Sequence, residues 1–365
     1  MVRSTFRRLL VSASYGASWI APALLVQGCA GEASDAATSA SRESRPAPSG
    51  SSTASTNKRG RNTTTTTSSS SSSSTNPLAR YTLYVDPYTD AADESALWAS
   101  VGYTEGVRLM DSIASQPSTL WLGDWTWDVE ATVNDTLDVA SGKLVTFVVY
   151  NIPNRDCGNW SSGGVTDATE YAAFVAAVAR GLAGRTALIV LEPDALALTD
   201  CLSATQESER FSMMAAAVAT LTTNGGRMYL DAGDSNWIPA ADMASRLVSA
   251  NVAGAAGFAL NVSHTEYTRN EIAYANELRA IVGTSAHYIV DTSRNGLGPT
   301  SDNQWCNPLG RALGSNPTVS TTDPGLDALL WVKPPGESDG ECNAGPAAGD
   351  WWADYGRDLA LMGGR

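Results

Sequence analysis

The chain has 365 residues and a formal net charge of −14, with 11 tryptophans and only two histidines. Nine of its Lys and Arg residues but only three of its Asp and Glu residues lie in the first 80 positions, so residues 81–365 carry a net charge of −20. This acidity argues against nucleic acid or an anionic membrane surface as a partner, because both require a positive protein surface. A neutral glycan is compatible with it, and so is a purely solubilising role for the acidic side chains.

Residues 1–29 have the sequence pattern of an export signal, with basic residues first and an apolar stretch after them. Three arginines precede an apolar stretch over residues 9–26, which serines and a glycine dilute. That pattern favours a cleaved signal over a permanent membrane span. The stretch ends in Leu-Val-Gln-Gly-Cys, which resembles a bacterial lipobox with Cys29 as the lipid-carrying residue. Gln27 is unusual at its position, so a lipoprotein, a plain secreted protein and a chance cysteine all stay open.

Residues 30–79 are dominated by serine and threonine and contain no aromatic residue. Positions 63–75 are serine or threonine throughout. Such a segment cannot bury enough apolar surface to offset the entropy lost on ordering. The sequence therefore predicts a disordered tether, whose few basic residues keep it solvated.

Residues 80–365 have a length that suits one α/β barrel. Short apolar, β-branched runs predict strands over residues 83–85, 119–122, 144–150, 186–191, 227–230, 257–262, 286–291 and 326–333. Apolar residues at helical spacing predict helices over residues 91–113, 129–140, 171–183, 211–222, 240–250 and 270–282. The predicted fold class is α/β, a distorted (β/α) barrel of seven to eight strands in a single catalytic domain.

Acidic residues follow three of these strands. Asp156 and Asp194 come after two neighbouring strands, and Asp339 comes after the last one. The carboxyl ends of the strands form the rim of an α/β barrel, where loops vary over a rigid scaffold and chemistry is done. Three acids among many tryptophans and few histidines indicate acid/base chemistry on a polyhydroxylated substrate such as a glycan.

Four cysteines lie in the predicted catalytic domain, and they admit three pairings: Cys157, Cys201, Cys306 and Cys342. None has the C-x-x-C spacing of a zinc site, so disulfides and an oxidising compartment are favoured and no metal is expected. Pairing in sequence order would tie each loop that follows an acidic strand end to a neighbouring rim loop. Closing loops of this length contributes roughly 3–4 kcal/mol each on the chain-entropy model.

Six phrases occur in order along the chain: YNIPNRDC, LEPDALA, YLDAG, DTSRNG, QWCNP and WVKPPGESDG. In order and spacing they resemble glycoside hydrolase family 6, the inverting β-1,4-glucanases that include cellulases, from about Tyr84 to the C-terminus. The resemblance implies β-1,4-glucan as the substrate, no metal or organic cofactor, and the disulfides Cys157–Cys201 and Cys306–Cys342. Together with the export signal, it predicts a monomer that is secreted by a bacterium or held at the cell surface as a lipoprotein, with a lipid on Cys29 as its only contact with a membrane.

The resemblance assigns catalytic roles to the three acids. Asp194 matches the general acid, Asp156 the residue that raises the pKa of this acid and stabilises the oxocarbenium-like transition state or relays a proton, and Asp339 the proposed base. Inversion requires a water between acid and base, so the two carboxyl groups should lie roughly 6.5–9.5 Å apart. The alternative for each aspartate is a helix cap or a turn.

The resemblance also implies residues that bind substrate or support the site. Substrate-binding residues are expected at Trp121, Tyr150, Trp237, Asn261, Trp305, Lys333 and Glu337, with the indoles as stacking platforms for sugar rings. Supporting roles are expected for Arg155 and Asp231, and for Ser161 or Ser162, which hold the catalytic water.

Three positions depart from the family pattern, and one of them is Trp160 in the loop over residues 158–164. Asp234 stands where the family usually has a histidine, and His264 stands where an asparagine is common. His264 either keeps a sugar contact with altered geometry or is a plain loop residue.

Only residues 341–350 separate the last phrase from Trp351, whereas processive members of the family have a long insertion there. The sequence therefore predicts an open cleft and an endoglucanase. An exo-acting cellobiohydrolase, a hydrolase of another β-glucan and a catalytically weakened glucan-binding lipoprotein remain as alternatives.

Overall fold

The computed structural model describes residues 76–365. The predicted export signal, Cys29 and nearly all of the predicted tether lie outside the described residues. Residues at the end of the predicted tether make fixed contacts with the barrel: Asn76 donates from Nδ2 to the backbone oxygens of Val319 (2.8 Å) and Asp327 (2.7 Å), and Leu78 is fully buried. Within the described part of the chain, no helix is long and apolar enough to cross a membrane.

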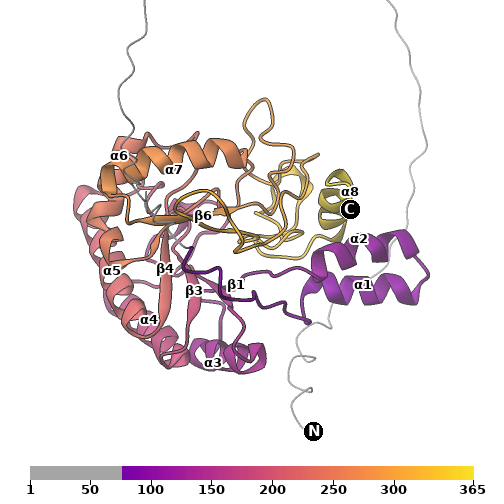
Figure 1. The fold of residues 1–365 in the computed structure, drawn as a ribbon, viewed down its shortest axis with the longest axis horizontal. Helices are drawn as coiled ribbons and strands as arrows, with labels where there is room; N and C mark the ends of the chain where they lie inside the picture. Colours follow the sequence, from indigo (N-terminus) through magenta and orange to yellow (C-terminus); the bar gives the residue numbers. More distant parts are fainter. Residues whose placement is uncertain (1–75) are drawn as a thin grey trace, which may run out of the picture. The chain divides into compact units, whose positions relative to one another are not determined.

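Seven parallel strands form one curled sheet in which each strand pairs with the next along the chain (Figure 1). The strands are β1 (Leu120–Leu122), β2 (Thr146–Val149), β3 (Ala187–Leu191), β4 (Gly226–Asp231), β5 (Gly257–Leu260), β6 (His287–Asp291) and β7 (Leu326–Leu330). The predicted strand over residues 83–85 is wrong, since only one isolated bridge forms there, between Leu83 and Leu144. The chain turns away at Asp86-Pro87, and proline has no N–H to continue a ladder.

The barrel is not closed by backbone pairing, because β1 and β7 are the two edges of the sheet. Side chains bridge the gap instead. Trp121 Nε1 donates to the backbone oxygen of Val332 (2.8 Å), and Thr119 Oγ1 donates to that of Trp331 (3.2 Å). The structure therefore confirms a distorted α/β barrel with seven strands, and it places Trp121 at the open seam.

Eight α-helices surround the sheet in the described residues: α1 (Asp90–Ser100), α2 (Thr104–Ala114), α3 (Val129–Ala140), α4 (Ala168–Leu182), α5 (Ala204–Thr223), α6 (Ala240–Ser249), α7 (Thr268–Val282) and α8 (Ala353–Met362). Three short 3₁₀ helices, Asp156–Gly158, Val252–Gly254 and Cys342–Ala344, lie in loops. Helices α3 to α7 cover the outer face of the sheet, whereas α1 and α2 lie beside α8 (Figure 1).

Two predicted helix boundaries are wrong for local reasons. The single helix predicted over residues 91–113 is two helices, because Gly102 has a φ of 77° and ends the first one. Helix α5 starts seven residues before the predicted position, since Ser203 and Gln206 form a reciprocal capping box that begins it at Ala204.

Alternation along the strands decides which side chains reach the cleft. Phe147 and Val149 of β2 pack outward in the core between sheet and helices, while Val148 and Tyr150 pack in the interior of the barrel. This is the two-residue period of an extended chain. Tyr150 therefore ends the strand facing inward, at the rim where the acidic loops begin.

Candidate active site

The loops after β2 and β3 hold their acids in a backbone conformation that L-residues rarely adopt. Asp156 has a φ of 55°, Asp194 of 68° and Glu192 of 51°. Each such residue costs on the order of 1–3 kcal/mol and persists only where surrounding contacts enforce it. Glu192 supplies such contacts, because its fully buried carboxylate accepts the N–H groups of Asn151 (3.0 Å) and Ile152 (3.2 Å). Glu192 thus joins the two loops.

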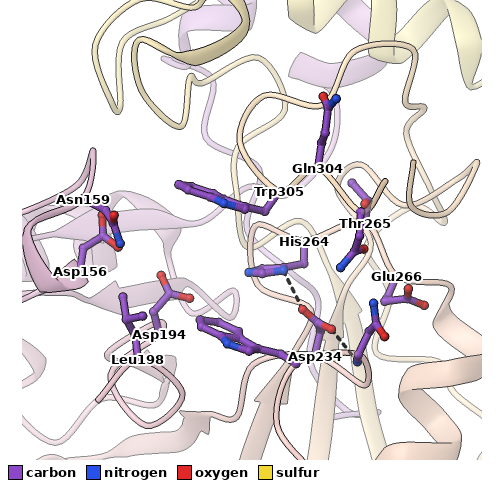
Figure 2. A pocket seen from close by; sticks show the side chains of 13 residues that line it. Asp156, Asn159, Asp194, Leu198, Asp234, His264, Thr265, Glu266, Gln304 and Trp305 are labelled. Atoms are coloured by element: carbon purple, nitrogen blue, oxygen red, sulfur yellow. Dashed lines mark hydrogen bonds and ion pairs between the residues drawn. The ribbon is translucent and has the colours of Figure 1, made fainter. Parts of the chain in front are cut away.

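A cleft lies above the strand ends. It contains a cavity of about 320 Å³ and a smaller one of about 60 Å³, and both are lined by Asp156, Asp194, His264 and Trp305. Figure 2 shows Asp156 and Asp194 on one side of the larger cavity and His264 and Trp305 on the other. The larger cavity is also lined by Trp237, and the smaller one by Trp121, Tyr150, Ser161, Lys333 and Asp339. Asp194 therefore lies where the two halves of the cleft meet.

Asp194 is half-buried and has no hydrogen bond to a cation among the described residues. Burial raises its pKa to about 6, and the negative charges of Asp156 and Asp339 act in the same direction against the positive charge of His264. Its backbone N–H donates to Oδ2 of the buried Asp231 (2.9 Å). Asp194 therefore keeps its proton at pH values well above the usual pKa of an aspartate.

Asp156 is fixed by the loop that follows it. Its Oδ2 accepts the N–H of Ser161 (2.8 Å), and burial raises its pKa. Arg155 donates to Asp124 (2.9 Å) and to the backbone oxygens of Ser161 and Ser162 (2.8 and 3.3 Å). Arg155 therefore pairs with a neighbouring carboxylate. Its other bonds hold the serine loop against the barrel.

Asp339, unlike Asp194, lies among positively charged side chains. Its Oδ2 accepts from Nη1 of Arg294 (2.7 Å) and from the N–H of Asn307 (2.8 Å), and Nζ of Lys333 lies 3.8 Å from Oδ1. Burial alone would raise its pKa, but the charges of Arg294 and Lys333 together with these hydrogen bonds hold it below the usual value. Asp339 is therefore ionised over a range of pH in which Asp194 still keeps its proton.

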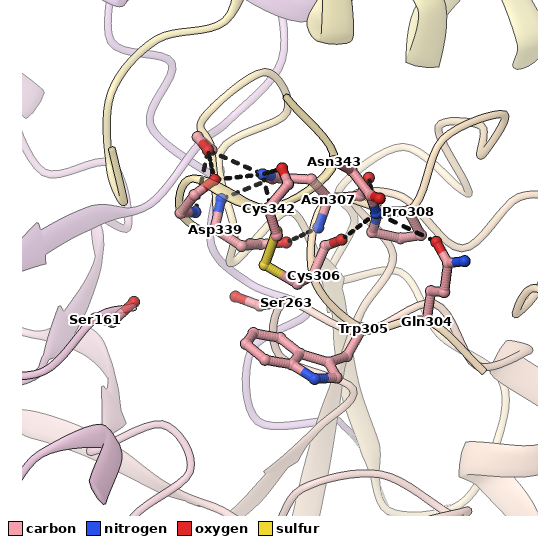
Figure 3. The surroundings of a disulfide bond; sticks show 12 residues. Ser161, Ser263, Gln304, Trp305, Cys306, Asn307, Pro308, Asp339, Cys342 and Asn343 are labelled. Carbon is pink, nitrogen blue, oxygen red and sulfur yellow. Dashed lines mark hydrogen bonds between the residues drawn. A yellow bond between two sulfur atoms is a disulfide. The ribbon is translucent and has the colours of Figure 1, made fainter. Parts of the chain in front are cut away.

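Two disulfides tie down the acidic loops, Cys157–Cys201 beside Asp156 and Cys306–Cys342 beside Asp339. They are the sequence-order pairs that the family resemblance implied. Figure 3 shows the second disulfide next to Asn307, whose backbone N–H and side-chain oxygen both bond to Asp339. Each disulfide therefore restrains a loop that carries a catalytic candidate.

Three indoles line the cleft at different points. Trp121 packs edge-on against Tyr150 with ring centroids 5.3 Å apart, Trp237 stacks with His264 at 5.5 Å, and Trp305 keeps 47% of its surface exposed. Indole faces suit the apolar C–H face of a β-glucosyl ring. The three tryptophans therefore surround Asp194 with surfaces on which sugar rings can stack.

Comparison with known proteins assigns the chain to a family. The model of glycosyl hydrolases family 6 matches residues 78–362. The chain belongs to this family. It is 42% identical over 282 residues to endoglucanase A of Cellulomonas fimi, an alignment that covers 76% of this chain but only 60% of that enzyme. A probable cellobiohydrolase C of Aspergillus fumigatus is 28% identical over 348 residues, which cover 77% of this chain and 76% of that protein.

A solved structure supports the same assignment. The endoglucanase Cel6 of Mycobacterium tuberculosis, in complex with a thio-linked methyl cellobiosyl cellobioside, superposes with a TM-score of 0.75 at 42% identity. The superposition covers 80% of this chain and all of that one. The family 6 fold therefore accounts for the whole described barrel.

Two predicted binding residues of the family 6 site line neither of these two cavities. Asn261 is fully buried, where its Nδ2 donates to the backbone oxygen of Asp291 (2.8 Å) and its Oδ1 accepts from Glu266 N–H (2.9 Å). Glu337 lies behind Lys333, with Oε2 3.8 Å from Nζ. Any contribution of the fully buried Asn261 to binding is therefore made through its neighbours, whereas the side chain of Glu337 keeps 24% of its surface exposed.

Several residues of the site were not found from the sequence. Arg294 is 2% exposed and neutralises Asp339. Asp291 is buried and accepts four backbone N–H groups, from Ser263, Ser293, Val332 and Lys333. Both residues belong to the phrase DTSRNG at the end of β6, so their place after a buried strand was the available signal. Within residues 76–365, no group of three or more His, Cys, Asp and Glu side chains is arranged to hold a metal ion.

The loop after β2 also touches the loop after β7. Gly340 has a φ of 148° and lies so close to Trp160 that a Cβ at this position would clash with the indole. Gly163 and Gly164, with φ of 147° and 85°, give the Trp160 loop conformations that other residues rarely adopt. This contact joins the two sides of the family 6 cleft on the Asp339 side.

Proposed function

We propose that the protein is an inverting endo-β-1,4-glucanase that hydrolyses cellulose or a soluble β-glucan. The observation that carries the proposal is the opposed pair of acids in one cleft: Asp194 retains a proton to about pH 6, whereas Asp339 is held ionised by Arg294. An inverting glycosidase requires one protonated and one ionised carboxyl group on opposite sides of the scissile bond. The endoglucanase names of the family 6 relatives support the same class.

Asp194 would begin the reaction by donating its proton to the glycosidic oxygen. The bond from the anomeric carbon to that oxygen then breaks, and positive charge develops on the sugar ring. Asp156, whose carboxylate lies beside Asp194 in both cavities, stabilises this charge. The sugar on the Trp237 side leaves with the proton, and the sugar on the Trp121 side becomes the oxocarbenium-like centre.

A water molecule attacks the anomeric carbon from the opposite face and loses its proton to the Asp339 side of the cleft. Arg294 makes Asp339 a weak base. Proton transfer is therefore expected late, when the new carbon–oxygen bond has already made the water acidic. Ser161 lines the same small cavity and would orient this water, and attack from this face would give a product of inverted anomeric configuration.

Endo action is supported by the short segment 341–350 after the Asp339 loop and by the endoglucanase relatives. An exo-acting cellobiohydrolase is the alternative. We also propose that the enzyme acts as a monomer outside the cell, where its disulfides persist. Lipid on Cys29 is a separate prediction, which mass spectrometry of the mature N-terminus tests.

Hydrolysis of carboxymethylcellulose tests the proposed function, with viscosity and reducing ends followed together for the wild type and Asp194→Ala. An endoglucanase lowers viscosity early, and the variant should lose this activity by about 10²-fold to 10⁴-fold. Cellobiose as almost the only early product, without a fall in viscosity, would instead establish exo action. Binding without hydrolysis by the wild type would point to a degenerate glucan-binding protein.

A further inference from the structure

Both histidines of the chain pair with an aspartate, one at the carboxyl end of the sheet and the other at its amino end. Nδ1 of His264 lies 2.7 Å from Oδ2 of Asp234, and Nδ1 of His287 lies 2.7 Å from Oδ1 of Asp327. His264 lines the cleft after β5. His287 is the first residue of β6 and lies at the amino end of the sheet, away from the acidic loops. The two pairs have the same contact distance, so the second is a natural control for the first.

The cleft pair is rigidly placed. Asp234 follows the end of β4 and is 6% exposed, and its Oδ1 accepts the N–H of Asn236 (2.7 Å). The imidazole of His264 lies at 26° to the indole of Trp237, with ring centroids 5.5 Å apart. Figure 2 shows the ring projecting into the cavity above Asp234, on the side that faces Asp194. Asp234 thus fixes the orientation of a ring whose far edge is in the cleft.

The free edge of His264 is a hydrogen-bond donor. Burial alone would lower the pKa of His264, but the hydrogen bond and charge of Asp234 raise it to about 9, and Asp234 itself has a lowered pKa. The imidazolium donates through Nδ1 to Asp234, which leaves Nε2–H for another acceptor. Among residues 76–365, no hydrogen-bond partner of Nε2 is found, and the side chain is 20% exposed to the cleft.

We propose that Asp234 and His264 act as one positioning unit, in which Asp234 aims Nε2–H of His264 at a hydroxyl oxygen of the leaving-group sugar stacked beside Trp237. This inference rests on the proposed function and deepens it. The unit unites two of the departures from the family pattern, since the aspartate that replaces the usual histidine holds the histidine that replaces the common asparagine. Because Asp234 fixes the direction of Nε2–H, the hydrogen bond forms only with a sugar that has a hydroxyl oxygen at the matching ring position. The unit therefore discriminates between leaving-group sugars by the position of this hydroxyl.

A mutant cycle tests the unit, with Asp234→Asn, His264→Asn, the double variant, and His287→Asn as the matched control. The substrates are cellotetraose, which places a sugar beside Trp237, and 2,4-dinitrophenyl β-cellobioside, whose leaving group is not a sugar. We expect each single variant to lower kcat/KM for cellotetraose by about 10-fold to 100-fold, as for loss of a hydrogen bond from a charged donor. The double variant should lose no more than the worse single variant.

The aryl substrate separates positioning from damage to the fold. The three cleft variants should hydrolyse it within a few-fold of the wild type, and His287→Asn should leave both substrates unaffected. Equal losses on both substrates, losses that multiply in the double variant, or unchanged hydrolysis of cellotetraose would each overturn the inference. Wild-type protein without hydrolytic activity would refute the proposed function instead. Calorimetry with cellotetraose measures binding affinities for the same set of variants, each made in an Asp194→Asn background that does not hydrolyse the ligand during the titration.

Discussion

The loops after β3 and β7 carry the two acids that the proposed reaction needs, and they treat a carboxyl group in opposite ways. Asp194 is near Asp156 and Asp231 and has no direct cationic partner among the described residues, and its pKa is about 6. Asp339 is more deeply buried, yet Arg294 and Lys333 keep its pKa below the usual value. Burial thus gives opposite outcomes, because the sign of the neighbouring charge decides which form of the carboxyl is stable.

The two loops also differ in how they are built. Asp194 depends on a left-handed backbone held by Asp231 and by the buried Glu192. Asp339 depends on side chains that come from other loops, Arg294 and Asn307. A carboxyl that must carry a proton in the resting enzyme has few charged contacts at its oxygens, whereas one that must be ionised when buried is stabilised by several. Substitutions that exchange these properties should break the division of roles.

The largest effect is expected from Asp194→Asn. The amide cannot protonate a leaving oxygen, so kcat on cello-oligosaccharides should fall by about 10³-fold to 10⁴-fold. Hydrolysis of 2,4-dinitrophenyl β-cellobioside should fall far less, because dinitrophenolate leaves without a proton. Steady-state kinetics on both substrates measure the difference. Equal losses on the two substrates would show that Asp194 is not the acid.

Removing the cation beside Asp339 should have the next largest effect. Arg294→Met leaves a buried carboxylate without its main partner, which should lower the free energy of unfolding by about 3–5 kcal/mol and raise the pKa of Asp339. The added substitution Asp339→Asn should restore part of the stability but not the activity. Denaturant unfolding and kcat measure both effects.

Arg357→Met is the control for that experiment. Arg357 pairs with Asp354 on the surface, at the same 2.7 Å as the buried pair. Exposed pairs contribute only about 0–1 kcal/mol, so this variant should unfold almost like the wild type. Similar losses for the two arginine variants would mean that Asp339 is not specially stabilised.

Asp156→Asn should reveal how much of the difference between the acids is electrostatic. In the wild type, activity should fall as pH rises above about 6, because Asp194 then loses its proton. Removing the negative charge of Asp156 lowers the pKa of Asp194, so the alkaline limb of kcat/KM should move to lower pH. The acid limb, set by ionisation of Asp339, should stay below about pH 4. A shift of the alkaline limb to higher pH would contradict this account.

The smallest effect on catalysis is expected from the disulfides. Replacing Cys306 and Cys342 by serine, or Cys157 and Cys201 likewise, should lower the free energy of unfolding by about 2–4 kcal/mol. At temperatures where the variants remain folded, kcat should change only a few-fold, since hydrogen bonds also hold both acids. Thermal unfolding measures the loss of stability. The kcat of each variant is then measured roughly 20 °C below its own melting temperature, where it is folded, because a change of 1 kcal/mol in stability shifts the melting temperature by only about 2–4 °C. Lost activity in a fully folded variant would show that the disulfides themselves orient the acids.

The sequence predicted most strands and helices because each has a local signal. Helix α3 was predicted with its observed ends, since Asp128 caps it and its apolar residues recur at helical spacing. The break at Gly102 and the early start of α5 were missed, although their signals, a glycine and a capping box, are short and local. The fixed contacts of Asn76 could not be predicted, because its partners lie more than 240 residues away.

By itself, the sequence determined the fold class, the family and the three acids at the strand ends, because strand periodicity and short motifs are local properties of the chain. The family resemblance assigned the roles of acid and base, but only the tertiary structure gave the physical reason why Asp194 keeps its proton and Asp339 does not. Arg294, Lys333 and Asp339 belong to loops that meet only when the sheet curls, and charge acts through space rather than along the chain. In the same way, the departures at Asp234 and His264 looked independent in the sequence, and the fold brings them together as one pair.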